Sequence, residues 1–129
     1  MSDKFTVEII SPEHIILKQQ TSEVIIPSFE GHMGILKDHI PLITFLRPGF
    51  ITIKADKVNK YYVEEGTVEF SNNSLLILTS SVKNVENFEK NLISSLVQDE
   101  VKKLNDPKVS DKERYISTHK IQTLKEISQ

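Results

Sequence analysis

The sequence predicts a β plus α chain: an N-terminal antiparallel β-sandwich of about eight to ten short strands, followed by a C-terminal α-helical hairpin. Two observations predict this fold. Before about residue 85 the apolar residues recur with period two, and after it they recur with helical spacing. All four glycines and four of the five prolines precede the same point. We therefore expect a sandwich domain over residues 1–85 and a hairpin over residues 86–129.

Short alternating segments indicate the strands. Apolar and polar residues alternate over residues 5–9, 51–54, 61–64 and 67–70, and turn residues separate these runs. Arg47-Pro48-Gly49 suits a type II turn, in which proline fixes φ and glycine accepts a positive φ. Strands this short, this often interrupted, favour a closed antiparallel sheet.

Two helices are predicted after the strands, over about residues 87–104 and 111–127. The first has a continuous apolar stripe, and Asn105-Asp106-Pro107 ends it. The second begins with a capping box, in which Ser110 accepts from the backbone of Glu113. Its apolar stripe is thin, so we expect this second arm to dock weakly.

Composition excludes several functional classes. The chain has 16 basic and 18 acidic residues and a formal net charge of −2, without a basic stripe, which disfavours nucleic acid. Without cysteine there are no disulfides and no thiolate chemistry. No signal-like segment or membrane-length apolar run occurs. We expect a cytoplasmic protein that could work beside a membrane as part of a larger assembly.

The candidate catalytic and metal-binding groups are few. His32 and His39, with Asp38 and Ser28, could be drawn as a metal or a Ser-His-Asp site, but their spacing matches neither. A local loop role is favoured for each of them. We therefore predict no catalytic residue, no metal and no cofactor.

Two pairs of charged residues have structural interpretations. Glu64 and Glu65 are strand neighbours that point to opposite faces, so they cannot share a substrate, and Glu64 is expected to be solvated. Asp111 and Arg114 are expected to form an i, i+3 ion pair on the second helix.

The run from Ile40 to Leu46 is apolar with almost no alternation. Such a strand needs cover on both faces. Either the chain's own helices cover its outer face, or that face is a subunit interface.

Several segments, in this order, resemble the epsilon subunit of the F-type (F1Fo) ATP synthase over nearly the whole chain. They are residues 5–13, Glu30-Gly31-x-x-Gly34-Ile35-Leu36, His39-x-Pro41-Leu42, Arg47-Pro48-Gly49-x-Ile51-x-Ile53, residues 61–69 and residues 75–79. The resemblance implies a sandwich with a helical hairpin, as periodicity also predicts.

The resemblance further implies a non-catalytic subunit of the central stalk, or rotor, which couples rotation of the membrane c-ring to the gamma subunit. The C-terminal helices are implied to regulate ATP hydrolysis through contacts with the alpha and beta subunits. The implied location is peripheral, in the F1 sector on the cytoplasmic face of the bacterial inner membrane.

The resemblance also assigns contact residues by position. The residues implied to face gamma are Ser11, His39 and Leu42. Those implied to meet the c-ring are Glu30, Gly31 and His32, and many members have an acid where His32 stands, and Pro-Gly where Lys37-Asp38 stand. A histidine there would make the ring contact sensitive to pH. Asp111-x-x-Arg114 matches only part of the ATP-binding signature of some members.

The alternative function is a free-standing β-sandwich module that binds a sugar or peptide and dimerises through its helical hairpin. It predicts an exposed aromatic platform, for which Tyr61 and Tyr62 are the candidates.

Overall fold

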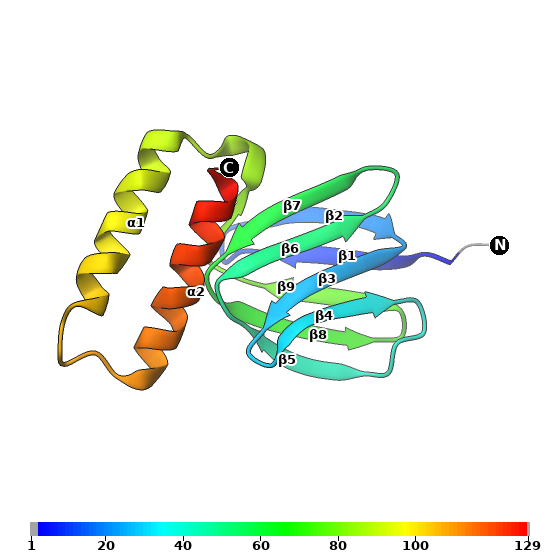
Figure 1. Cartoon of the computed structure of the whole chain (residues 1–129). Helices are drawn as coiled ribbons and strands as arrows, with labels where there is room; N and C mark the ends of the chain where they lie inside the picture. Colours follow the sequence, from blue (N-terminus) through cyan, green and yellow to red (C-terminus); the bar gives the residue numbers. More distant parts are fainter. Residues whose placement is uncertain (1–2, 129) are drawn as a thin grey trace.

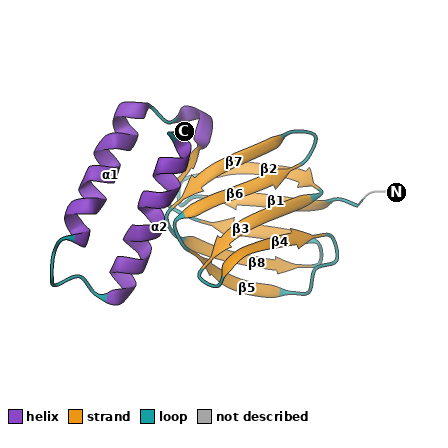
Figure 2. Cartoon of the chain, viewed as in Figure 1, coloured by secondary structure: helices purple, strands orange, loops and turns teal. Residues whose placement is uncertain are grey.

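The computed structural model describes residues 3–128 and has a strand-rich half followed by two helices (Figures 1 and 2). The described strands are β1 Phe5–Ile10, β2 Ile15–Thr21, β3 Glu23–Ser28, β4 Gly31–Leu36, β5 Leu42–Leu46, β6 Gly49–Lys54, β7 Val58–Val63, β8 Gly66–Ser71, β9 Ser74–Leu78 and β10 Val82–Asn84. A 3₁₀ turn, η1 (Val85–Asn87), leads to helix α1 (Lys90–Leu104) and helix α2 (Asp111–Ile127). The predicted order of sandwich and hairpin is confirmed.

The strands form one continuous sheet folded into a sandwich. Its order is β10-β7-β6-β3-β5-β8-β9-β1-β2, and β4 pairs with β3 off this path. Strand β3 pairs with β6 and β4 along much of its length and meets β5 only through Ser28 and Leu46. This single shared pair is where the sheet turns from one layer to the other. The predicted antiparallel sandwich is confirmed, with one exception: β1 and β9 run parallel.

The hydrophobic core lies between the two layers. Its buried residues come from alternate positions of the strands: Phe5, Val7, Ile9, Val24, Ile26, Ile35, Leu46, Ile51, Ile53, Val63, Val68, Phe70, Leu75 and Ile77. The rings of Phe5 and Phe70 meet edge to face with centroids 5.6 Å apart. The apolar residues at alternate strand positions therefore pack together between the two layers.

Two glycines in the sandwich are required for different reasons. Gly66 begins β8 with φ of 156°, and an added Cβ would lie 2.5 Å from the carbonyl oxygen of Leu78. Gly49 does not have the positive φ that a type II turn requires, so that expectation was wrong. A Cβ on Gly49 would instead lie 2.5 Å from Cβ of Pro27, and close packing explains this glycine.

The hairpin lies beside one end of the sandwich, with α2 on the sandwich side of α1 (Figure 1). Helix α1 begins at Lys90, later than residue 87, because residues 85–87 form the 3₁₀ turn. Ser110 caps α2 as expected: its hydroxyl accepts from the Glu113 backbone at 3.1 Å. The helix with the thinner apolar stripe is therefore the one nearer the sheet, and its buried residues are Ser117, Thr123 and Leu124.

Candidate functional site

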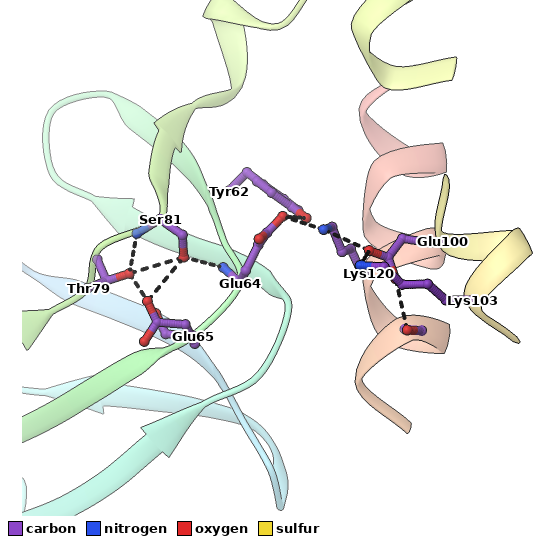
Figure 3. A network of polar contacts seen from close by, with 9 residues as sticks. Tyr62, Glu64, Glu65, Thr79, Ser81, Glu100, Lys103 and Lys120 are labelled. Carbon is purple, nitrogen blue, oxygen red and sulfur yellow. Dashed lines mark hydrogen bonds and ion pairs between the residues drawn. The ribbon is translucent and has the colours of Figure 1, made fainter. Parts of the chain in front are cut away.

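The most extensive polar network of the described residues joins the hairpin to the sheet (Figure 3). Nζ of Lys120, on α2, lies 2.9 Å from a carboxylate oxygen of Glu100 on α1 and 2.9 Å from one of Glu64, which follows β7. Ser117 donates to Glu100 at 2.8 Å, and the Tyr62 hydroxyl donates to Glu64 at 2.9 Å. One ammonium group therefore connects three separate elements.

The network remains charged although it is largely removed from water. Burial by itself would raise the pKa of Glu100, but hydrogen bonds from Lys120 and Ser117 outweigh it and the pKa is lowered. Burial by itself would lower the pKa of Lys120, and the bonds to Glu100 and Glu64 raise it instead. Burial, and then the charge of Glu64, raises the pKa of Tyr62 far above 10.0. The phenol is therefore a permanent donor and Lys120 a permanent cation.

The two neighbouring glutamates have separate partners, as strand geometry requires. Glu65 accepts from the backbone and hydroxyl of Ser80 on the side away from the hairpin. Glu64 was expected to be solvated, and that was wrong because Lys120 pairs with it. The sequence offered no signal for this pairing, since Lys120 is one of many charged residues on a polar helix.

The residues assigned to the c-ring lie together at the turn between β3 and β4. Gly31 takes a φ of 122°, and its carbonyl accepts from the Ser28 hydroxyl at 2.7 Å. The turn also contacts α2: the rings of Phe29 and Tyr115 stack with centroids 5.8 Å apart, and the Tyr115 hydroxyl donates to the Phe29 carbonyl. Glu30 is exposed at this turn, and His32 is exposed on β4.

The residues assigned to gamma are spread along one side of the sandwich. Ser11 directly follows β1, whose last residue, Ile10, pairs with Leu78. The Ser11 hydroxyl hydrogen-bonds to the backbone of His14 and so stabilises the turn after β1. His39 lies at the other end, where its ring meets the edge of Phe70. Leu42 packs against the core and does not point outward. The structure therefore places Ser11 and His39 at opposite ends of this side and turns Leu42 away from it.

An apolar surface lies between those two ends, on the outer face of β5, β8 and β9. Ile43 is 75% exposed and Phe45 61% exposed, while register places Phe45 in one row with Thr67 and Leu78. We call Ile43, Phe45 and Leu78 the β5–β9 patch. Phe45 also lines a hollow beside α2, but all three side chains stay at least 44% exposed, so the alternative in which the helices cover the outer face of this run does not hold.

Asp111 and Arg114 occupy the first turn of α2. No ion pair joins them in the described part of the chain, so the expected i, i+3 pair was wrong. Arg114 donates instead to the Leu104 carbonyl at 3.3 Å, where α1 ends. A guanidinium there satisfies a terminal helix carbonyl and complements the helix dipole.

The residues considered for catalysis are separated. Ser28 donates to Gly31, Asp38 accepts from Asn73, and a His39 ring nitrogen lies 2.8 Å from the Ile40 carbonyl. Among residues 3–128, no group of three potential metal ligands is found. The aromatic platform of the alternative function is also missing from its expected place: Tyr62 is buried against Phe88, and Tyr61 packs on the core.

The comparisons first define a class. Residues 4–85 match the family model described as ATP synthase, Delta/Epsilon chain, beta-sandwich domain. By fold, the chain is similar to one from the Euglena gracilis mitochondrial ATP synthase, with a TM-score of 0.83, 18% identity and coverage of 100% of this chain and 84% of that one. A chain of the Tetrahymena thermophila mitochondrial ATP synthase has a TM-score of 0.66 at 13% identity, with 96% of each covered.

Sequence relatives then define the particular family. The ATP synthase epsilon chain of Pelagibacter ubique is 44% identical and covers 99% of this chain and 100% of the relative. That of Allorhizobium ampelinum is 30% identical over 76% of this chain and 74% of its own length. The chain therefore belongs to the ATP synthase epsilon chain family, whose members are non-catalytic subunits of the rotary complex. No helix in the described residues is long and apolar enough to cross a membrane.

Proposed function

We propose that this chain couples rotation of the c-ring to the gamma subunit as a rigid element of the central stalk. The observation that carries the proposal is the β5–β9 patch, which leaves large apolar side chains exposed to water on neighbouring strands. A partner that buries Ile43 and Phe45 would cover the outer face of β5, while the core covers its inner face. In this assignment Ile43 and Phe45 face gamma, with Ser11 and His39 at the two ends of the contact.

The turn between β3 and β4 is the proposed contact with the c-ring, through Glu30, Gly31 and His32. Its exposed carboxylate and histidine suit the polar loops of a membrane ring. The contact would be peripheral to the membrane, on the cytoplasmic face of the bacterial inner membrane within the F1 sector.

The hairpin is the proposed regulatory element, which would contact the alpha and beta subunits when it leaves the sandwich. Its junction supports this role, because its buried apolar cluster is much smaller than that of the sandwich core and is joined by a charged network. ATP binding at Asp111 and Arg114 is the weaker proposal, since Arg114 already donates to the end of α1.

Co-expression with the cognate gamma subunit and size-exclusion chromatography tests the main proposal. We expect a stable one-to-one complex that Ile43→Asp or Phe45→Asp disrupts. Val58→Asp is the matched control, because Val58 is also 61% exposed but lies on β7, away from the patch. Two separate peaks for the unmodified pair at low and moderate salt would overturn the proposal.

A further inference from the structure

A cavity of about 400 Å³ lies between α2 and the sheet, on the face of β6 and β7 that meets the helix. Neither Asp111 nor Arg114 lines it. Its walls carry an unusual set of charged and titratable groups: Arg47, Lys60, His32, His119 and Glu126. Two permanent cations and two histidines therefore share the cavity with one carboxylate.

Arg47 is the most unusual of these groups. The residue is only 7% exposed, and its Nε is buried without a hydrogen-bond partner. One terminal nitrogen donates to the neighbouring Pro48 carbonyl at 2.8 Å. No carboxylate of residues 3–128 forms an ion pair with it. A buried guanidinium is normally matched by an anion, because an uncompensated buried charge is costly.

The other charged and titratable side chains around the cavity also form no ion pair within residues 3–128. Nζ of Lys60 lies 5.4 Å from the centre of the Phe50 ring, so its charge is held beside the cavity. The His119 ring packs against Tyr115, and its nitrogens have no hydrogen-bond partner among the described residues. Glu126 forms no ion pair in the same part of the chain.

Basic and histidine side chains outnumber the one carboxylate in the cavity lining. Burial lowers the pKa of His119, and the nearby charges of Arg47 and His32 lower it further. The part of this shift that comes from Arg47 and His32 reflects positive charge beside the His119 ring, where an anion would be attracted. Planar guanidinium groups bind phosphate oxygens through paired hydrogen bonds, and lysine adds a point charge.

We propose that this cavity binds a phosphoryl oxyanion, with the Arg47 guanidinium as its principal ligand and Lys60 and His119 completing the site. The ligand is defined by its tetrahedral, doubly charged chemistry, which inorganic phosphate and the phosphoryl group of a larger molecule share. Arg47 and Lys60 belong to the sandwich, whereas His119 belongs to α2. A bound oxyanion therefore connects the two regions and stabilises the docked hairpin.

The experiment is a ¹⁵N-resolved NMR titration of the full chain at pH 7, with inorganic phosphate and with ATP in separate arms. Sodium chloride keeps the ionic strength constant, because exposed charges respond to salt alone. We expect saturable shifts at Arg47, Gly49 and His119. Shifts in both arms identify the phosphoryl group as the recognised unit, and shifts with phosphate alone identify the free ion.

Variants locate the site. Arg47→Gln is expected to weaken the affinity by about tenfold or more. Lys60→Gln and His119→Gln alter less buried side chains, so they keep the proposal testable if Arg47→Gln does not fold. Lys57→Gln, in the exposed turn before β7, is the matched control and should leave the affinity unchanged. The proposal would be overturned if the shifts failed to saturate in both arms. It would also be overturned if Lys60→Gln and His119→Gln did not weaken the shifts.

Discussion

Different kinds of interaction stabilise the sandwich core and the junction between the hairpin and the sandwich. The core cluster consists of 14 buried apolar residues, so its stability comes mainly from non-directional burial. The junction has three buried apolar residues, Tyr62, Ile93 and Leu124, beside the cluster of Glu100 and Lys120. A junction of this kind depends on geometry and charge, and it can be disrupted while the sandwich stays folded.

The largest expected effect is in the core. Phe70→Ala should lower the free energy of unfolding by about 3–5 kcal/mol, because it removes a fully buried ring and leaves a cavity against Phe5. Chemical denaturation followed by circular dichroism measures it. Ile43→Ala is the control: at 75% exposure its truncation should change stability by less than about 0.5 kcal/mol. Equal losses in the two variants would contradict an exposed β5–β9 patch.

At the junction, Lys120→Met should cost about 2 kcal/mol, less than an ideal buried pair, because Lys103 and Ser117 still contact Glu100. Hydrogen exchange should show faster exchange in α1 and α2 and unchanged protection in the sandwich. Lys125→Met, at an exposed position of the same helix, is the matched control.

A double variant sharpens this prediction. Adding Glu100→Met to Lys120→Met removes the buried carboxylate that has lost its Lys120 partner, so part of the lost protection should return. Protection that falls equally in the sandwich and the hairpin would mean that the two regions unfold as one unit.

A smaller effect is expected at the start of α2. Ser110→Ala removes the hydroxyl that accepts from the Glu113 backbone and should cost about 1 kcal/mol. Thr118→Ala, within the helix, is the control, since its hydroxyl donates only to the carbonyl one turn earlier. Because the cap belongs to α2, the rate of hydrogen exchange should increase in α2 alone.

The smallest expected effect is a pH dependence at His119. Its pKa in the folded chain lies below the ordinary value of 6.5, mainly through burial, so the unfolded chain binds the proton at higher pH. Stability should therefore fall as the pH decreases through and below 6.5. The charged and titratable groups around it are Arg47, His32, Lys60, Glu126 and Tyr115. Denaturation of His119→Gln over this range should give a shallower slope, and an unchanged slope would contradict the assignment.

Most of the fold could be predicted because its signals are local. Alternation identified the strands, the change of period separated them from the helices, and Ser110 marked the start of α2. Local patterns mispredicted details that depend on distant neighbours, such as the packing of Gly49 against Pro27 and the parallel pairing of β1 with β9.

The candidate sites were less predictable for the same reason. The apolar run of β5 indicated an interface, but Leu42 was assigned to it, whereas Ile43 and Phe45 point outward. In a strand, a shift of one residue reverses the face, so only the observed register decides this assignment.

The sequence by itself determined the two regions, their secondary structure and the family, because these follow from periodicity, caps and ordered motifs within short segments. Only the tertiary structure decided which helix meets the sheet, that Lys120 bridges Glu64 and Glu100, and that Arg47 is buried beside His119. Those contacts join residues far apart in the chain. Their energies depend on distance and burial, and neither is encoded in any one segment.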